Sequence, residues 1–467
     1  MAGGDGIYTR ALAEYIANSH DEPLPADLVE WMKLLTLDTI GCGLLASQMP
    51  WTQRIVDTLT ATEAPGPSLI WGTDKRFSPA NAAMANGTSV HGFELDDVGA
   101  GSHYGSVTTT VALALAEAGS PLSGKDLIRA TVTGIEIGAR VSECCGRVPH
   151  VTCGFHGPGL YGAFAAMAVG AYVLNLDADQ CVHAIGNVAQ FTGGLMGTHH
   201  GGMGKRLLAG KAAHSGTLAA QLAKHGFTNV DNIFECGYGS FPSAFSGARD
   251  TFDLEKLRAG LGEEFRAYDV NFKVWACRVP IHPSLEAIKQ MRQPHPIDPD
   301  EIERVDIRLP EGSYKAVGFP YTPTTITSAQ LNLSYCLAIM LLENDVFVDQ
   351  FTEEKIRSPR VLDLIKRIHV HHDPSLDNAP AGTIARETVV EVTLKNGERL
   401  SQRGAVRGYG GNPVTKDEIV AKFRKMTRDR LTEAEQDRVI ELCNSLDELP
   451  DATVMLEPLA KSSSPGA

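Results

Sequence analysis

Alanine, glycine and other small residues dominate the chain from about residue 79 to about residue 225, and this feature most restricts the possible folds. The segments 111–116 and 162–171 are apolar on every face that a helix would present. Such helices are buried, and small side chains let them pack closely. Because polar residues interrupt the apolar runs before about 18 residues, a membrane bundle is not expected. The segment therefore predicts the core of a soluble helical domain.

Amphipathic helices are predicted on both sides of this core. Residues 8–16 and 28–37 carry apolar side chains at three- and four-residue steps, the period of a half-buried helix. Towards the other end of the chain, residues 415–418 have the pattern of a capping box, and 431–444 predict a further helix. Both ends of the chain are therefore expected to be helical.

The pattern changes in the second half of the chain. Residues 302–309 and 387–394 alternate apolar and polar side chains, as half-buried strands do, and the second of them runs into a Lys-Asn-Gly hairpin turn. Between these strands, residues 329–343 and 359–370 are predicted to form helices. This part of the chain is therefore expected to be α+β.

Length, charge and cysteine content exclude several classes of function. A chain of 467 residues is longer than a single hydrophobic core usually accommodates. Its net charge of −14 argues against a general nucleic-acid binder. An anionic substrate would then need a local basic pocket. The nine cysteines include no C-x-x-C pair, so zinc and iron–sulfur sites are not supported. Because no basic segment followed by an apolar one opens the chain, we expect a cytoplasmic protein with reduced thiols.

Lys205 and Arg206 follow the glycine-rich run 201–204 and open an alanine- and leucine-rich helical pattern. Free backbone N–H groups and the positive end of the helix dipole favour anion binding at such a position. A solvated helix start with ordinary surface lysines has the same spacing. The stretch by itself leaves both interpretations open.

Two loops carry histidines that are suited to acid–base chemistry. His91 precedes the acidic segment 94–97, and His103 follows it. Carboxylates close to an imidazole can orient a general acid or base, although a polar loop with an aspartate helix cap would have the same composition. His156 lies among three glycines and a proline, which suggests a backbone that approaches a ligand closely or a plain turn.

Basic residues gather where the helical pattern gives way to the α+β pattern. Lys273, Arg278 and His282 lie within one stretch of ten residues. Substrate clefts tend to form at domain boundaries. These three side chains are therefore further candidates for a binding site.

Together these stretches resemble one family. The motifs that carry the resemblance are Leu37-Asp38-Thr39-Ile40-Gly41, Asn86-Gly87, the segment from His91 to His103, Gly154-Phe155-His156, the segment from Lys205 to Gly216, and Lys273…Cys277…His282. In this order, over nearly the whole chain, they resemble the MmgE/PrpD family, which includes 2-methylcitrate dehydratase, cis-aconitate decarboxylase and iminodisuccinate epimerase. The acidic segment begins with glutamate, as in the fungal cis-aconitate decarboxylases, which the chain resembles most.

The resemblance implies a mostly α fold. It predicts a large all-helical domain built from both chain ends, residues 1–271 and 408–467, and an inserted smaller α+β lid domain, residues 272–407. The change of pattern described above falls at the same places. Family members are typically homodimers without a metal or organic cofactor, so we expect a homodimer, no cofactor, and no nucleic-acid or membrane partner.

The resemblance also implies the site residues. The expected catalytic residues are His103, His156, Lys205 and Lys273. The expected substrate-binding residues are Glu94, Asp97, Arg278 and His282, with Tyr314 and Tyr321 as alternative candidates for a site tyrosine. The family usually has His-Pro-Ser where this chain has His-Tyr-Gly-Ser at 103–106, which leaves the identity of the substrate open.

The function implied is that of a cofactor-independent lyase acting on a small di- or tricarboxylate by decarboxylation or dehydration. Lys205, Lys273 and Arg278 would hold its carboxylates in a partly desolvated cleft. His103 would protonate the anion left by CO₂, or abstract a proton in a dehydration, while His156 relays a proton. An epimerase of the iminodisuccinate type uses the same proton abstraction and is the second hypothesis. A non-catalytic binding protein of the same fold is the third.

Overall fold

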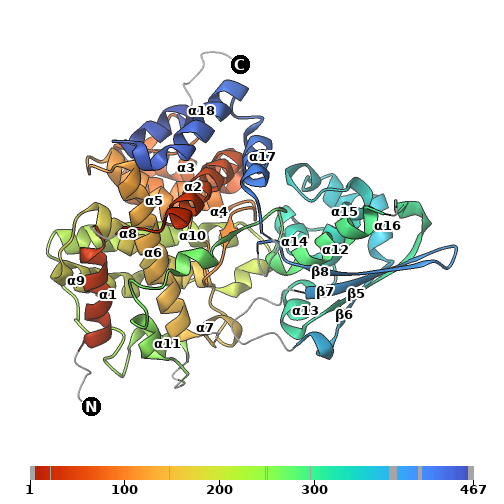
Figure 1. Ribbon diagram of the computed structural model, residues 1–467, viewed down its shortest axis with the longest axis horizontal. Coiled ribbons are helices and arrows are strands. Elements are labelled where there is room, and N and C mark those ends of the chain that lie inside the picture. The colour runs from red at the N-terminus through yellow and green to blue at the C-terminus, as the bar shows by residue number, and fades with distance from the viewer. Residues whose placement is uncertain are drawn as a thin grey trace.

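The chain forms a large helical part and a smaller part that contains a β-sheet (Figure 1). The computed structural model describes residues 6–20, 23–146, 148–247, 249, 251–294, 296–377, 387–408 and 413–460. Residues 1–5 and 461–467, at the ends of the predicted helical domain, and residues 409–412, beside its predicted boundary, lie outside the described residues. Helices account for 58% of the residues and strands for 9%, which confirms the prediction of a mostly α fold.

The large part consists of helices from both ends of the chain. Its helices are α1 (Ile7–Asn18), α2 (Ala26–Ala46), α3 (Pro50–Thr62), α4 (Pro79–His91), α5 (Thr109–Glu117), α6 (Gly124–Cys145), α7 (Val148–Val151), α8 (Gly157–Val173), α9 (Ala178–Phe191), α10 (Gly204–Lys224), α11 (Phe241–Phe245), α17 (Lys416–Thr427) and α18 (Glu433–Asn444). Its strands are the two-residue pairs β1 (Ser68–Leu69) with β2 (Arg76–Phe77) and β3 (Asp97–Val98) with β4 (Asn271–Phe272). None of the described helices is both long and apolar enough to cross a membrane.

The centre of the large part is the packing of α10 against α8 and α4. All residues of α8 are buried, as its uniformly apolar composition predicts. A Cβ atom on Gly216 would lie 2.4 Å from the Cβ of Ala166, and one on Gly210 would lie 2.2 Å from the carbonyl oxygen of Met84. Only glycine allows α10 to approach both neighbours this closely. The predicted close packing of small residues is therefore confirmed.

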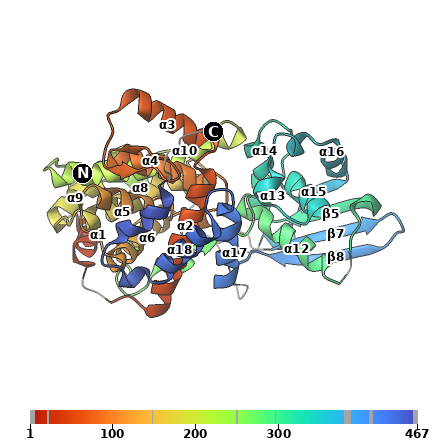
Figure 2. The ribbon, with the colours of Figure 1, turned by 90° about the horizontal axis from the view of Figure 1, so that it is seen from above.

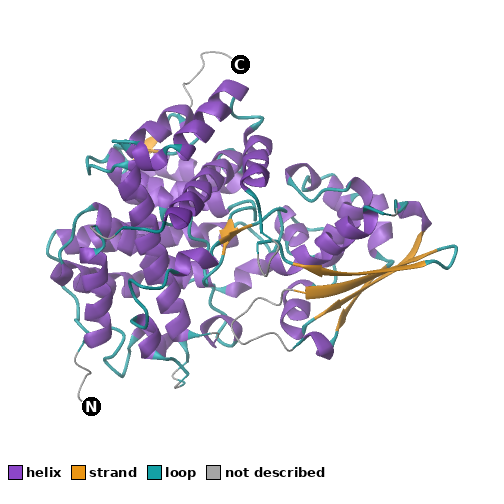
Figure 3. Ribbon diagram, in the orientation of Figure 1, coloured by secondary structure: helices purple, strands orange, loops and turns teal. Residues whose placement is uncertain are grey.

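The smaller part is a four-stranded sheet covered by helices (Figures 2 and 3). Its strands, in spatial order, are β6 (Ile368–His372), β5 (Ile302–Leu309), β7 (Glu387–Leu394) and β8 (Arg399–Ala405). Its helices are α12 (His282–Arg292), α13 (Glu311–Val317), α14 (Ile326–Gln330), α15 (Leu333–Glu343) and α16 (Pro359–Ile365). The strands at 302–309 and 387–394 and the hairpin between β7 and β8 were predicted from alternation and are confirmed.

Two helix predictions in this part are wrong in extent. The expected helix at 329–343 is divided into α14 and α15, because the Asn332 side chain accepts a hydrogen bond from the Tyr335 backbone N–H and starts a new helix. The expected helix at 359–370 ends at Ile365. Residues 368–372 instead form β6, which pairs in parallel with β5. A partner strand far away in the sequence thus overrides the local helical pattern.

The C-terminal helices return to the large part after the sheet is complete. Helix α17 packs on α2 and α18 also contacts α2, so residues almost 400 positions apart lie side by side (Figure 1). The predicted capping box is present at the start of α17, where the Thr415 side chain accepts from the Glu418 backbone N–H. This return brings α17 into contact with the acidic segment 94–97, because Lys422 of α17 donates a hydrogen bond to the carbonyl oxygen of Leu95.

Candidate active site

The acidic segment and the boundary lysine meet through the short pair of strands β3 and β4. Asp97 pairs with Phe272, and Val98 pairs with Asn271. This antiparallel register places the residues before β3 beside Lys273, which directly follows β4. Two stretches about 175 residues apart in the sequence are thereby brought together where the large and the smaller parts meet (Figure 3).

Three buried cations surround the carboxylate of Glu94. Lys205 lies in the first turn of α10 and donates a hydrogen bond to Glu94. Arg206, the next residue, donates to the same carboxylate over 3.1 Å, and Lys273 donates over 3.3 Å. The helix start predicted at 204–205 is confirmed. The alternative of a solvated surface lysine does not hold, because Lys205 and Arg206 are only 2% and 0% exposed.

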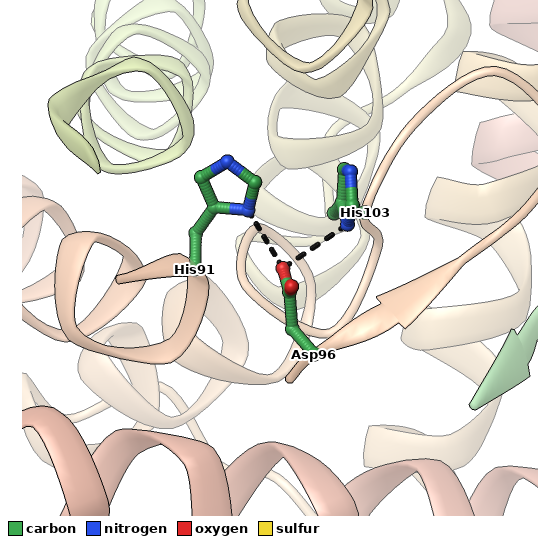
Figure 4. A group of neighbouring side chains, drawn as sticks. All are labelled: His91, Asp96 and His103. Atoms are coloured by element: carbon green, nitrogen blue, oxygen red, sulfur yellow. Dashed lines mark hydrogen bonds and ion pairs between the residues drawn. The ribbon is translucent and has the colours of Figure 1, made fainter. Parts of the chain in front are cut away.

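Asp96 connects this cationic cluster with two histidines (Figure 4). One of its oxygens lies 2.7 Å from Nδ1 of His91 and 3.2 Å from Nδ1 of His103. Its other oxygen accepts a hydrogen bond from Lys273 over 3.1 Å. Asp96 is therefore a shared carboxylate that fixes both rings and one lysine.

The surroundings of the two rings determine which nitrogen of each carries a proton. Nδ1 of His103 lies 2.6 Å from the carbonyl oxygen of Asp97, which only accepts, so this nitrogen is the donor. Nε2 of His103 is therefore the nitrogen with a free lone pair when the ring is neutral. In His91, Nε2 accepts from Lys205 over 3.1 Å, and Nδ1 donates to Asp96. Of these two rings, only His103 thus has a nitrogen without a hydrogen-bond partner among the described residues.

Burial and neighbouring charges shift the pKa values of the cluster. Burial and the Lys205 charge lower the pKa of His91 well below its usual value, so this ring is neutral. Burial, Arg206 and Lys273 lower the pKa of Lys205 well below its usual range, whereas the ion pair with the Glu94 carboxylate favours its ammonium form. Burial works to raise the pKa of Asp96, but His103 and Lys273 reverse the effect and hold that pKa well below its usual value. Asp96 is therefore ionised and able to stabilise a protonated His103.

His156 lies next to this cluster, at the N-cap of α8. Its ring centre is 6.0 Å from that of His91 and 4.8 Å from that of His199, which belongs to the short 3₁₀ helix Met196–His200. Burial, followed by the charges of His199 and His91, lowers the pKa of His156 well below its usual value. Its Nδ1 atom is buried without a hydrogen-bond partner among the described residues. The ring is therefore placed near the reacting groups with a polar atom still unpaired.

Asp97 takes a different role from its neighbour in the sequence. Its carboxylate accepts hydrogen bonds from the backbone N–H groups of Tyr104 and Gly105, over 2.6 and 2.9 Å. Burial and the adjacent Asp96 raise its pKa to about 7. Asp97 therefore shapes the loop that carries His103, and it makes no contact with the three cations among the described residues.

The other expected binding residues lie in the smaller part, and the described structure shows no hydrogen bond or ion pair between any of them and Glu94. The Arg278 charge nevertheless contributes, after burial, Arg206 and Lys273, to the lowered pKa of Lys205. Arg278 donates to the carbonyl oxygen of Ala316, and His282 donates to that of Cys277. Tyr321 donates to the carbonyl oxygen of Ile356, whereas Tyr314 is 38% exposed beside His372. The structure thus brings together His103, His156, Lys205, Lys273 and Glu94. It leaves Arg278, His282 and both tyrosines in contacts of their own.

Four further residues complete the cluster and were not among the predicted site residues: His91, Asp96, Arg206 and Gln330. The first three lie within three positions of predicted residues, and their ionisable side chains were visible in the sequence. Gln330 had no such signal. Its side-chain oxygen accepts from Arg206 over 2.6 Å, which joins α14 of the smaller part to α10 of the large part.

His91, Asp96 and His103 form a group whose ligand atoms are close enough to hold a metal ion. Its surroundings do not suit a cation. The ammonium group of Lys205 lies 3.1 Å from His91, and that of Lys273 lies 3.1 Å from Asp96. Two fixed positive charges at this distance repel a divalent cation and attract anions. The group is therefore better suited to binding a carboxylate beside an imidazole.

Comparisons with known proteins agree with this arrangement of motifs. Residues 10–253 match the model of the MmgE/PrpD N-terminal domain, and residues 275–448 match that of the MmgE/PrpD C-terminal domain. The chain is 28% identical to the cis-aconitate decarboxylase-like protein oryM of Aspergillus oryzae, over 97% of both chains. It is 27% identical to a cis-aconitate decarboxylase of Aspergillus terreus, over 97% of this chain and 95% of that one. It is also 22% identical to a 2-methylcitrate dehydratase of Salmonella typhimurium, over 73% of this chain and 72% of that one.

Both family models match in the expected order, and together they cover most of the chain, including Glu94, Lys205 and Arg206. The resemblance inferred from the motifs is thereby confirmed. The chain belongs to the MmgE/PrpD family.

Proposed function

We propose that this protein is a cofactor-independent lyase that decarboxylates cis-aconitate or a closely related tricarboxylate. The observation that carries the proposal is the meeting of three buried cations, Lys205, Arg206 and Lys273, with a histidine that keeps one ring nitrogen unengaged. Relatives over nearly the full length of the chain are named cis-aconitate decarboxylases, which supports the same reaction.

Binding of the substrate rests on the cationic cluster. Charge-assisted hydrogen bonds to carboxylates are about twice as strong as neutral ones, and burial strengthens them further. Lys205 and Lys273 are the two ammonium groups that can turn towards a substrate carboxylate. Arg206 remains tied to Gln330 and Thr327 of α14, so we assign it to the support of Glu94.

The chemical step needs one proton donor. The C–C bond to the departing carboxylate breaks, CO₂ leaves, and the electron pair remains on the carbon skeleton, where a neighbouring carboxylate delocalises it. Protonated His103 then delivers its Nε2 proton to carbon, while Asp96 stabilises the imidazolium before transfer. One proton is consumed per turnover, and solvent must return it to His103. His156 is our candidate for relaying that proton.

Dehydration would need more from the site. A base must abstract a proton, and a second group must protonate the leaving hydroxyl. Since burial and the Lys205 charge keep His91 neutral, and Lys205 and Asp96 occupy both of its ring nitrogens, the cluster offers His103 for this work together with His156. This favours decarboxylation over the dehydration named for the Salmonella relative.

The test is incubation of the protein in D₂O with cis-aconitate and, separately, with 2-methylcitrate, followed by ¹H NMR. We expect loss of cis-aconitate, release of CO₂, and a product that carries one deuterium on the protonated carbon. Loss of water from 2-methylcitrate alone would replace the proposal with a dehydratase. Deuterium exchange without loss of CO₂ or water would indicate an epimerase, and no reaction with any small polycarboxylate would refute the enzymatic proposal.

Three related expectations rest on the family. We propose that residues 272–407 form a lid on a helical domain made from 1–271 and 408–467, that the protein is a homodimer, and that it works in the cytoplasm. The joining of α14 to α10 through Gln330 and Arg206 supports a lid that closes over the site. Light scattering coupled to size-exclusion chromatography measures the assembly, and a monomer at micromolar concentration would contradict the homodimer.

A further inference from the structure

Glu94 adopts a backbone conformation that glutamate rarely takes. Its φ angle is 58°, in the left-handed region, where the Cβ atom crowds the backbone. Such a conformation persists only when the surroundings hold it. The left-handed turn lets the Glu94 side chain point to the three cations while Asp96, two residues later, points to the histidines.

The first hold on this turn comes from the C-terminal helix α17. Lys422 donates a hydrogen bond to the carbonyl oxygen of Leu95 over 2.5 Å. The same ammonium group forms an ion pair of 2.6 Å with Asp38 of α2. Lys422 is only 7% exposed, so its charge is kept where these two acceptors require it. A residue that follows the whole smaller part thereby fixes the Leu95–Asp96 peptide, which begins one residue after Glu94.

The second hold comes from α14 of the smaller part. The side-chain amide of Gln330 donates to the carbonyl oxygen of Phe93 over 2.9 Å and to that of Ala276 over 3.0 Å. Its oxygen accepts from Arg206. Both amide protons and the oxygen are therefore used, which determines how the group is oriented. Gln330 thus fixes the peptide directly before Glu94 and is itself completely buried.

We propose that Lys422 and Gln330 are positioning residues that clamp the backbone on both sides of Glu94 and hold its carboxylate among the three cations. They act through Glu94 and do not touch the substrate. The clamp deepens the proposed function and rests on it, because its purpose is to place the carboxylate partner of Lys205 and Lys273. Helix α14 belongs to the smaller part and helix α17 to the C-terminal end of the large part, so the carboxylate is correctly placed only when both have packed against the backbone around Glu94.

The experiment is a pair of double-mutant cycles with cis-aconitate. Lys422→Met and Gln330→Leu are each measured alone and in a Glu94→Gln background, with kcat and KM followed by NMR. Each clamp variant alone should lower kcat/KM about 10- to 100-fold, since misplacing a site group by about 1 Å has this effect. On top of Glu94→Gln, either clamp variant should change kcat/KM less than about twofold, because the group that it positions is already lost. Lys422→Arg, which keeps a cation and donors, should retain most of the activity.

Matched controls separate positioning from general destabilisation. Lys33→Met removes a lysine that is also 7% exposed and doubly ion-paired but lies away from the acidic segment. Gln350→Leu removes a buried glutamine of the smaller part that bonds to Glu343 and Phe347. Both controls should lower Tm and leave kcat/KM within about threefold. The proposal would be overturned if a clamp variant lowered kcat/KM by the same factor with and without Glu94→Gln. It would also be overturned if the control variants lowered kcat/KM as much as the clamp variants do.

If Lys422→Met does not fold, the Gln330→Leu cycle decides alone by the same criterion. For every variant in the two cycles, ligand binding is also measured, as the rise in Tm caused by tricarballylate, an unreactive tricarboxylate. If the wild-type protein turns over none of the acids but these cycles are non-additive, the proposed reaction is wrong and the clamp stands. If turnover occurs and the cycles are additive, the reaction stands and the clamp is wrong.

Discussion

Replacing His103 with glutamine should remove the acid–base step and leave the rest of the site in place. Glutamine can still donate to the carbonyl oxygen of Asp97, which now accepts from Nδ1 of His103 over 2.6 Å. Its amide cannot carry an exchangeable acidic proton to carbon. The side chain of His103 is 14% exposed, and among the described residues it forms an ion pair only with Asp96, so the cost in stability should be small.

The expected loss of kcat depends on whether another imidazole could deliver the proton in place of His103. His91 is the nearest imidazole, 4.6 Å away between ring centres, but Lys205 and Asp96 occupy both of its nitrogens. The ring centre of His156 is 6.0 Å from that of His91. With no substitute in place, the loss should equal the usual contribution of a general acid, about 10²- to 10⁴-fold in kcat, or about 3–5 kcal/mol.

The assay is the initial rate of CO₂ release from cis-aconitate at saturating substrate. His183→Gln is the matched control, because His183 is also a part-buried histidine bonded to a backbone carbonyl, that of Asn229, but lies on α9 outside the site. We expect the control to keep its activity and KM for His103→Gln to change little. If His103→Gln keeps more than about a tenth of the wild-type kcat with an unchanged Tm, the acid–base assignment is wrong.

Three further predictions test other parts of the argument. Lys205→Met should lower kcat/KM by about 10²-fold through loss of one buried charge-assisted hydrogen bond. The control, Lys211→Met, removes a lysine of the same helix that is bonded to a backbone carbonyl, and it should change kcat/KM little. Equal effects of the two substitutions would place Lys205 outside the site. Because the folded-state pKa of Asp97 is raised to about 7, the folded protein binds its proton more tightly than the unfolded chain does. Its contribution to stability is therefore present below about pH 4 and falls by up to about 4 kcal/mol as the pH rises to about 7. Thermal melts of wild type and Asp97→Asn across this range should converge towards the acidic end, and parallel curves would contradict the shift. Gly210→Ala should destabilise the protein by about 1–3 kcal/mol, because the new methyl group would overlap a carbonyl oxygen of α4; Gly204→Ala, where the nearest atom is 3.4 Å away, is the control, and equal melting temperatures for the two variants would refute the close-packing argument.

Much of the fold could be predicted because its elements have strong periods. The strand at 302–309 was predicted with its observed bounds, and the capping box at Thr415 marks the start of α17 correctly. Residues 368–372 could not be assigned in the same way. Their strand exists because β5 offers a parallel partner. The alternation of Ile368 and Val370 with histidines is too short to be distinguished from the end of the helical pattern that precedes it.

The site was only partly predictable for a comparable reason. Asp96 and Asp97 are adjacent and identical in kind, and the sequence does not tell which one faces the histidines. In an extended segment, successive side chains point to opposite sides. The pairing of β3 with β4 decides the matter, by turning Asp96 towards Lys273 and Asp97 towards the loop amides.

By itself, the sequence determined the helical core, the α+β pattern of the second half, the family, and the residue types that gather at the site, because these depend on local period and on motifs read in order. Only the tertiary structure decided which charges meet. Lys205, Arg206 and Lys273 share one carboxylate because α10, β3 and β4 converge there. The glutamine and lysine beside Glu94 come from segments separated from it by more than 200 residues. Hydrogen bonds and ion pairs act over a few ångströms, so their partners are chosen by the packing of whole elements, which no local pattern encodes.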